Sequence, residues 1–433
     1  MSDASHYLQG RLGMRVVMVF AAAYFLSYAF RAINAVIAPA LMADLQLSNA
    51  DLGLLSSAYF VGFACLQLPL GVWLDKYGPR RTESALLAFA ALGAAIFASS
   101  DTLAGLWLGR ALIGIGVSAC LMAPFKAYRV WYPPERQSQL ASWMLVFGTC
   151  GALATTVPVA KLLPVIGWRG VFWAMATLIV LAATLLFFRL KPVEKEMAQR
   201  QSQMGSAPAA PGGYRAIFSD PYFRRMAWLG GVYQGGFMAI QTLWAGPWMV
   251  TVLGLSLDET SRVLFLFNLF LMLSYVGLSW WSPRYVSYGG RPGVPALRIV
   301  TYGLSLSMLI QLAMLLFPYS WAWVFWLLFA LVVTVTTLAQ THVSLSFPSS
   351  QAGRANSAFN LTLFIGAFSL QWGMGLLIDT FMSYGWGHAS AIRMAWAVYL
   401  LLQLCALISF VMTRSRIAPF AEKLNHASSG RMV

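Results

Sequence analysis

Two arginines in apolar surroundings are the residues of this sequence with the clearest potential for chemistry. Arg31 and Arg110 each lie inside a long run of apolar residues, where a charge is costly unless it is paired or hydrated. A guanidinium group pairs bidentately with a carboxylate or a phosphate. We therefore predict that Arg31 binds an anionic substrate; the alternative is that it reaches outward to water or binds backbone carbonyls. For Arg110 we favour a coupling or structural role over direct substrate contact.

The acidic residues limit how such a site could work. None of the 14 acids lies in the middle of an expected apolar segment, and Asp75, Glu83 and Asp379 lie at segment edges. A proton-coupled carrier normally uses a buried ionisable group as its relay. We therefore do not expect proton symport through a carboxylate.

Neutral polar residues inside the apolar segments are further candidates for contacts with a solute. Each one singly is more often part of a hydrogen bond between helices, but together they suit a polar substrate. Asn356, Asn360 and Gln371 share one helical face, because spacings of four and eleven residues return to the same side. The predicted substrate-binding residues, besides Arg31, are Asn34, Tyr59, Gln67, Trp143, Tyr233, Gln234, Gln241, Asn268, Asn360 and Gln371.

His342 is the only histidine inside an expected membrane span. It lies near the cytoplasmic end of that span, and Lys126 is its near-equivalent earlier in the chain. We predict that both contribute to an inner gate, with a proton relay as the alternative for His342 because histidine titrates near neutral pH. The four cysteines lie in apolar segments without metal-ligand spacing, so we predict packing roles for them, no metal site and no cofactor.

The elements that must position these residues are membrane-spanning helices. Hydrophobic residues make up 59% of the chain and charged residues only 10%, whereas soluble domains carry about 25% charged residues. An apolar stretch of about 18 residues or more is long enough to cross a bilayer. We expect an all-α membrane protein with twelve spans, near residues 14–40, 50–74, 82–99, 102–124, 138–163, 168–188, 223–251, 260–282, 296–317, 320–346, 354–381 and 390–412.

The basic residues predict the orientation of these spans. The net charge of +15 comes from short segments between the apolar runs, as expected from the positive-inside rule and not from a nucleic-acid-binding surface. With the N-terminus in the cytoplasm, the loops on the external side contain only Lys161, Arg169, Arg262 and Arg393. We therefore expect both termini in the cytoplasm, in a multi-pass protein of the cytoplasmic (inner) membrane.

A central segment divides the chain into two halves that resemble each other. Residues 189–222 contain a run of glycine, alanine, proline and serine typical of a linker, which separates residues 1–188 from 223–433. Ser48-Asn49-Ala50-Asp51 and Ser256-Leu257-Asp258-Glu259 place a capping-box start at corresponding positions of the halves. This alignment puts Ala239 opposite Arg31, which favours a singly charged organic anion over a phosphate ester.

The loop from Gly71 to Arg81 resembles the signature loop of the major facilitator superfamily, with Lys76 in place of the usual first arginine. The resemblance implies two pseudo-symmetric six-helix bundles and a loop that latches one state of an alternating-access cycle. Gly71 would let two helices approach closely, and Asp75 would face a helix N-terminus or a basic partner. The residues expected in this latch are Gly71, Asp75, Gly78, Arg80 and Arg81.

A finer resemblance covers roughly the first 140 residues. Arg110, followed by Gly114 and Gly116, is similar to the second motif of the superfamily. Together with segments around Arg31 and residues 131–136, it resembles the anion:cation symporter branch, which carries organic anions and sugar acids. The chain departs from that branch at Phe30 and Val117, where an aspartate and a glutamate are usual.

Three classes of function follow from these observations. The first is a secondary transporter that moves a small organic anion, such as a carboxylate, by symport or exchange, and that acts as a monomer in the lipid bilayer. The second is an exporter of drugs or metabolites, although the fifth span has no Gly-Pro pair. A sensor derived from a transporter is a third. We do not expect an enzyme, because no convergent nucleophile, base or metal ligands are evident.

Overall fold

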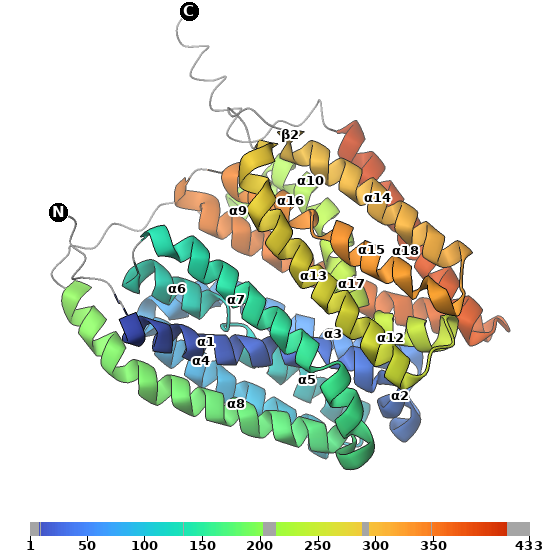
Figure 1. Cartoon of the computed structure of the whole chain (residues 1–433), viewed down its shortest axis with the longest axis horizontal. Helices are drawn as coiled ribbons and strands as arrows, with labels where there is room; N and C mark the ends of the chain where they lie inside the picture. The colour runs from blue at the N-terminus through green and yellow to red at the C-terminus, as the bar shows by residue number, and fades with distance from the viewer. Residues whose placement is uncertain are drawn as a thin grey trace, which may run out of the picture. The chain divides into compact units, whose positions relative to one another are not determined.

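The computed structural model describes residue 8 and residues 10–132, 134–201, 214–287, 294–347 and 349–413 (Figure 1). Nearly all of these residues are helical. Among them, the only strands are β1 (Val286–Ser287) and β2 (Val294–Pro295), which form a two-residue parallel pair.

The chain divides into two compact units. The first comprises Met1–Leu47 and Leu54–Pro208, and the second comprises Ser48–Gly53 and Ala209–Val433. The predicted boundaries at 1–188, 189–222 and 223–433 stay a prediction. Helix α8 continues to Gln201, inside the segment expected to be a linker, and residues 202–213 lie outside the described residues.

The helices up to residue 201 alternate between long spans and local breaks. Helix α8 bends at Gly167, where a φ of 65° interrupts the helix between the expected fifth and sixth spans. Helix α4 is interrupted in the same way at Gly78. The eight helices are α1 (Gly10–Ala32), α2 (Asn34–Leu45), α3 (Asn49–Cys65), α4 (Gln67–Ser99), α5 (Leu103–Val117), α6 (Met122–Trp131), α7 (Pro134–Ala154) and α8 (Val157–Gln201).

The helices from residue 214 onwards begin with an irregular segment. Residues 221–252 alternate between α-helix and π-helix, and this stretch includes several glycines and Pro247. Short π-helical turns are rare and often occur at functional sites. The elements are α9 (Tyr214–Ser219), α10 (Pro221–Gly230), η2 (Gly231–Gly235), α11 (Gly236–Ala239), η3 (Ile240–Trp244), α12 (Ala245–Pro247), η4 (Trp248–Val252), α13 (Leu257–Tyr285), α14 (Ala296–Leu316), η5 (Ser320–Trp323), α15 (Val324–Val333), α16 (Thr336–Leu345), α17 (Ser349–Ser383) and α18 (His388–Met412).

The membrane class predicted from composition is confirmed. Nine helices of the described residues are long and apolar enough to cross a membrane, or ten if the bent pair Asn49–Cys65 and Gln67–Leu74 is counted as one span. The remaining expected spans coincide with interrupted helices. The fifth, residues 138–163, is divided between α7 and the start of α8, and the seventh is the irregular segment of residues 221–252. The first expected span, which is counted among the nine through α1, also has a break at Ile33 between α1 and α2.

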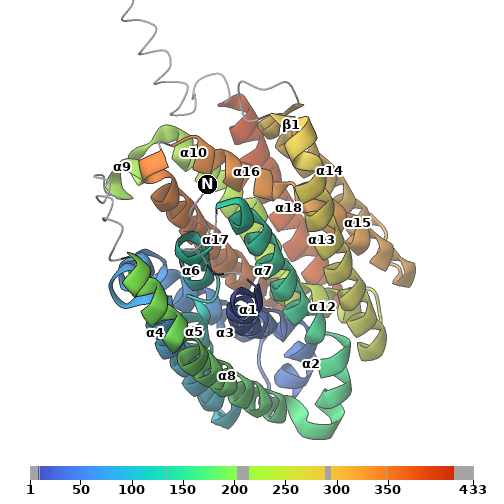
Figure 2. The same ribbon diagram turned by 60° about the vertical axis from the view of Figure 1, so that its left-hand side comes forward.

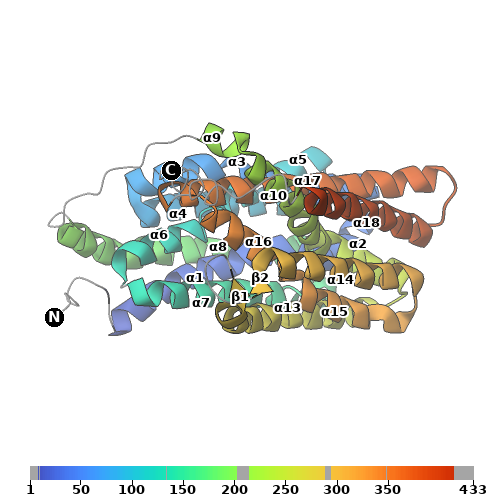
Figure 3. The same ribbon diagram turned by 90° about the horizontal axis from the view of Figure 1, so that it is seen from above.

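Each unit is built from helices packed side by side. In the first unit, α4 packs against α5 and α8, and α1 packs against α7; Figure 2 shows α8 running alongside α4. In the second unit, α17 packs against η2 and α18, and α14 packs against α15; the α17–α18 pair is visible in Figure 3.

Glycines bring the backbones of α3 and α5 into direct contact. A Cβ atom at Gly62 would lie 2.0 Å from the carbonyl oxygen of Ala111, and one at Gly114 would lie 2.1 Å from that of Tyr59. Only glycine leaves room for such an approach, which is a common way for membrane helices to pack. Among the described residues, a Cβ atom at Gly71 would meet nothing within 4 Å beyond its own helix, and Gly71 is on an exposed face of α4, so its predicted role in a close approach stays a prediction.

The latch loop ties α4 to α8 within the first unit. Gly78 has a φ of 78°, which L-residues rarely adopt, and this turn brings Arg80 toward α8. Nε of Arg80 donates to Oε2 of Glu194 at 2.6 Å, and the guanidinium stacks on the ring of Phe187. Because Arg80 is only 4% exposed, this ion pair is well shielded from water.

A second ion cluster joins α2 and α8. Arg169 donates hydrogen bonds to Asp44 and to Asp101, and Nε1 of Trp168 also donates to Asp44. These donors stabilise the carboxylate form and lower the pKa of Asp44. The stabilisation is therefore present at neutral pH and is lost as the pH falls through that lowered pKa.

We expect Gly114→Ala to destabilise the protein, because the added Cβ atom would overlap the backbone of α3. Overpacking of this kind costs about 1–3 kcal/mol. The measurement is thermal unfolding of the purified protein in detergent, followed by tryptophan fluorescence. Gly277→Ala is the matched control, since a Cβ atom there meets nothing within 4 Å. Equal melting temperatures for the two variants would contradict the close contact of α3 and α5.

Candidate functional site

Arg31 lies in the last turn of α1, among aromatic rings. Its guanidinium carbon is 4.7 Å from the ring centroid of Tyr28, 5.9 Å from that of Tyr59 and 5.7 Å from that of Phe63. At these distances the faces of the rings attract the cation. The aromatic faces therefore stabilise the positive charge of Arg31 within the helices.

Tyr59 of α3 connects this site to the second arginine. Its hydroxyl group hydrogen bonds with Arg31 and donates to the carbonyl oxygen of Ser27 at 3.4 Å. The guanidinium carbon of Arg110 is 5.7 Å from the centroid of the same ring. Tyr59 therefore contacts both arginines, and it is held in place by the close approach of α3 to Gly114.

Arg110 is 1% exposed and is directed toward α1. Its Nη1 donates to the carbonyl oxygen of Phe30 at 3.1 Å, and the rings of Phe97 and Phe172 surround its guanidinium group. These contacts join α5 to α1 and α8. The predicted structural or coupling role of Arg110 stays a prediction.

The other predicted residues of the first unit differ in what they contact. Nδ2 of Asn34 donates to Ser56 at 2.8 Å, which joins α2 to α3, while Oδ1 of Asn34 is buried without a hydrogen-bond partner among the described residues. Gln67 is 5% exposed, and its side-chain amide donates to the carbonyl oxygen of Phe63, four residues earlier in the chain. Trp143 is 51% exposed, and its ring lies against that of Phe147 on the same helix.

In the second unit, the predicted amides bind chiefly to one another and to hydroxyl groups. Nε2 of Gln241 donates to Asn268 at 2.9 Å, and Nε2 of Gln371 donates to Thr242 at 3.2 Å. Oε1 of Gln371 is buried and, within the described part of the chain, has no hydrogen-bond partner. This pair of contacts joins the π-helical segment to α13 and α17.

The remaining predicted residues of this unit have other contacts. The hydroxyl group of Tyr233 donates to the carbonyl oxygen of Gln403 at 3.0 Å, which binds it to α18. Oε1 of the neighbouring Gln234 is buried and lacks a hydrogen-bond partner among residues that the structure describes. Asn360 is half-buried on α17.

Of the predicted gating residues on α6 and α16, His342 has the best defined contacts. Nδ1 of His342 lies 2.5 Å from the hydroxyl of Tyr222 and 3.1 Å from that of Ser346, which holds its ring between α10 and α16. Lys126 is half-buried on α6. The side chain of Asp75 lies outside the described part of the structure, so its predicted role in the latch stays a prediction.

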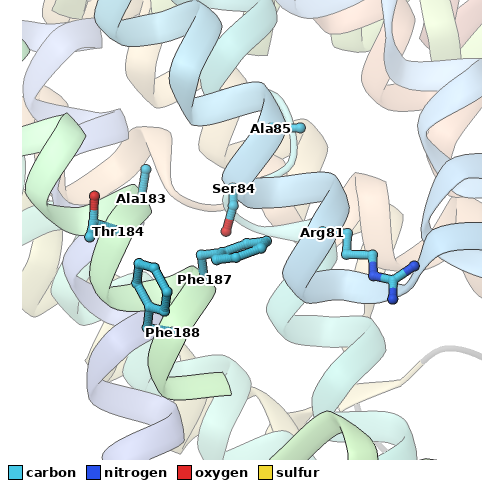
Figure 4. Close-up of a pocket in the computed structure, with 7 residues that line it drawn as sticks. All are labelled: Arg81, Ser84, Ala85, Ala183, Thr184, Phe187 and Phe188. Carbon is cyan, nitrogen blue, oxygen red and sulfur yellow. The ribbon is translucent and has the colours of Figure 1, made fainter. Parts of the chain in front are cut away.

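Arg81 borders a shallow apolar groove between α4 and α8 (Figure 4). The hydroxyl group of Ser84 points toward the ring of Phe187, whereas the guanidinium group of Arg81 extends away from the rings of Phe187 and Phe188. The groove is lined by Arg81, Ser84, Ala85, Ala183, Thr184, Phe187 and Phe188. None of the predicted substrate-binding residues lies in it.

Glu83 is the ionisable residue that the sequence reasoning missed. It was expected at the edge of a span, but its side chain is 0% exposed and lies in the helical stretch Lys76–Ser99. The thiol group of Cys120, in the break between α5 and α6, lies beside the carboxyl group. No local pattern of the sequence marks this burial, which follows from the packing of α4 against α5, α6 and α8.

Comparisons with known proteins connect this chain to transporters. The probable sulfoacetate transporter SauU of Cupriavidus necator is 26% identical over 219 residues, which are 48% of this chain and 49% of that protein. The 4-hydroxybenzoate transporter PcaK of Pseudomonas aeruginosa is 25% identical over 299 residues, 63% and 66% of the two chains. The multidrug resistance protein MdtL of Escherichia fergusonii is 30% identical over 162 residues, 35% and 39% of the two chains.

These matches span between about a third and two thirds of each relative's length. A solved structure supports the fold over the whole chain. The inward-facing, unoccupied structure of a bacterial homolog of the human lysosomal transporter Spinster has a TM-score of 0.72 and 15% identity, and the match covers 95% of this chain and 98% of that one. The family model of the Major Facilitator Superfamily matches residues 20–370. This protein belongs to the Major Facilitator Superfamily of membrane transporters.

Proposed function

We propose that this protein moves a small organic anion of the carboxylate type across the cytoplasmic membrane, by alternating access and as a symporter or an exchanger. Arg31 is the residue that binds the anion in this proposal. The supporting observation is its guanidinium group among the rings of Tyr28, Tyr59 and Phe63. An ionisable residue inside a membrane span is by default a candidate for the substrate pathway.

The chemistry of the Arg31 cluster suits a carboxylate. The planar fork of the guanidinium group matches the two oxygens of a carboxylate, which gives two parallel charge-assisted hydrogen bonds. The surrounding rings offer apolar contact to the carbon skeleton of the solute. The buried Oδ1 of Asn34, three residues further along the chain, would accept a hydrogen bond from a hydroxyl group on the same solute.

Two relatives are named for organic anions, sulfoacetate and 4-hydroxybenzoate, and this supports an anionic substrate here. The amides of the second unit, Gln234, Gln241, Asn268 and Gln371, are neutral. We propose that the residues predicted from this unit add no second positive charge to the selection of the solute, so that a single carboxylate is favoured over a multiply charged anion.

Export of drugs or metabolites is the second candidate function. It is favoured by the similarity to the multidrug resistance protein MdtL, which covers 35% of this chain. An exporter of cations or neutral compounds would gain nothing from a guanidinium group in its substrate pathway. Measuring the transport of anionic, cationic and neutral solutes in parallel therefore distinguishes the two functions. If none of these solutes is transported, the result favours a sensor.

We expect Arg31→Gln to weaken anion uptake, because a hydrogen bond to a charged group contributes about 1.5–3 kcal/mol. The half-saturating concentration should rise about 10- to 100-fold, as each 1.4 kcal/mol corresponds to a factor of ten. The measurement is uptake of a panel of organic carboxylates into proteoliposomes with the pH clamped on both sides. Arg31→Lys should give an intermediate loss, since it keeps the charge but not the bidentate geometry.

Arg262→Gln is the matched control for this experiment, because Arg262 pairs with Asp258 on an exposed helical turn. It should transport the anion as well as the unchanged protein does. An unchanged concentration dependence in Arg31→Gln would contradict anion binding by Arg31. Uptake of cationic or neutral compounds in place of anions would favour the exporter.

We expect His342→Gln to leave the pH dependence of uptake unchanged. The imidazole ring is held by the hydroxyl groups of Tyr222 and Ser346, which suits a fixed contact between α10 and α16. The measurement is the initial rate of uptake between pH 5.5 and 8, conditions that bracket the usual histidine pKa of about 6.5. A pH profile that becomes flat in this variant would show that His342 is a proton relay.

A further inference from the structure

Glu83 is buried in the first unit under conditions that disfavour its charge. Its side chain is 0% exposed, and among the described residues no nitrogen or oxygen donor binds its carboxyl oxygens, which face only the weak thiol donor of Cys120. No cation of the described chain forms an ion pair with it. An ionised carboxylate in such a place is costly unless it is paired. The neutral, protonated form is therefore the one that this arrangement favours.

The groups that face Glu83 are weakly polar. The thiol of Cys120 lies beside the carboxyl group, and the phenol of Tyr128, on α6, is also near it. Of the charged groups on the adjacent helices, Glu194 of α8 pairs with Arg80, Arg110 of α5 donates to a carbonyl oxygen of α1, and Lys126 is half-buried on α6. Nothing in these contacts compensates a negative charge on Glu83.

A short polar path connects Glu83 with the proposed anion site. Cys120 interacts through its thiol with both Glu83 and Ser27. The carbonyl oxygen of Ser27 accepts a hydrogen bond from Tyr59, whose hydroxyl group also contacts Arg31. The path crosses four parts of the unit, namely α4, the break between α5 and α6, α1 and α3. A change at the anion site can thus alter the surroundings of Glu83 through directly contacting residues.

We propose that Glu83 is the proton-binding site of this transporter, and that one proton travels with each anion. The carboxylate takes a proton from water on one side to form the neutral acid, which is stable when the helices close around it, and it releases the same proton to water on the other side. This inference rests on the proposed function, because the anion bound at Arg31 is the co-transported species. It reverses the expectation from sequence that no buried carboxyl group is present for proton symport.

The test compares two transport modes in the same proteoliposomes. In gradient-driven uptake, a pH difference of one unit is imposed without anion inside, and accumulation is measured. In counterflow, the pH is equal on both sides and labelled anion exchanges with unlabelled anion inside. A proton-coupling residue is required for the first mode only, since counterflow needs no net movement of protons. The probe is whichever carboxylate of the panel the unchanged protein exchanges fastest.

With one proton per monoanion, the unchanged protein should accumulate the anion about tenfold per pH unit, since one unit corresponds to about 1.36 kcal/mol. Glu83→Gln should reach an accumulation ratio of about one, whereas its counterflow persists. Asp258→Asn, which alters an exposed carboxylate, should behave as the unchanged protein. Two outcomes would overturn the inference and leave the proposed function standing. One is normal gradient-driven accumulation in Glu83→Gln, and the other is counterflow without gradient-driven accumulation in the unchanged protein. Absence of anion counterflow from the unchanged protein would instead overturn the proposed function and, with it, this inference.

A second measurement covers the case in which Glu83→Gln fails to fold. Infrared difference spectra of the otherwise unchanged protein should show the carbonyl band of a protonated carboxylic acid that responds to pH and to added anion. Cys120→Ala should shift that band, because the thiol is the neighbour of the carboxyl group, and Asp258→Asn should not. The assignment of Glu83 would be overturned if no carboxylic acid band responds to pH. It would also be overturned if the frequency of the band is the same in Cys120→Ala as in the unchanged protein.

Discussion

The cost of holding two guanidinium groups among apolar helices is the constraint on which the first unit depends. Arg31 and Arg110 are accommodated by aromatic faces and backbone carbonyls, and Tyr59 contacts both. Tyr59 can do so because α3 approaches α5 to within backbone contact at Gly62 and Gly114. Glycines of α3 and α5 thus position the ring of Tyr59, which stabilises the charges of Arg31 on α1 and Arg110 on α5. The glycines that follow Arg110 are part of the same arrangement as the arginine itself.

The two units contribute different chemistry. The first contains the buried cations, the shielded ion pair between Arg80 and Glu194, and the buried carboxyl group of Glu83. The second contributes neutral amides that are held by one another, as in the bond between Gln241 and Asn268. Charge recognition and proton binding are therefore proposed for the first unit.

Much of the fold was predictable from the sequence, because a helix long enough to cross a membrane must be apolar along its whole length. The breaks within the helices could not be predicted from the sequence in the same way. The division of the first span at Ile33, for example, leaves no pattern in the composition. The closeness of α3 and α5 depends on which glycine meets which backbone. For this reason the sequence named Gly71 as a candidate for close contact, whereas the partners of Gly62 could only come from the structure.

The candidate site divides in the same way. Arg31 was identifiable because a charge in an apolar run is conspicuous, but its aromatic neighbours come from three turns of two helices. Glu83 was missed because hydropathy places it at the start of an apolar run, next to basic residues. Its burial follows from the packing of α4 against α5, α6 and α8, which no local window of sequence describes. Trp143 is half exposed, and its expected place in the pathway stays a prediction.

The central claim is that a fixed positive charge at Arg31 selects the solute by its negative charge. Equilibrium binding to the purified protein in detergent tests this most directly, by calorimetry with the best carboxylate of the transport panel and with its primary amide, which has the same shape but no charge. The account predicts that the carboxylate binds, that the amide binds at least about tenfold more weakly, and that Arg31→Gln removes this difference. Equal affinity for the carboxylate and the amide in the unchanged protein would contradict the account.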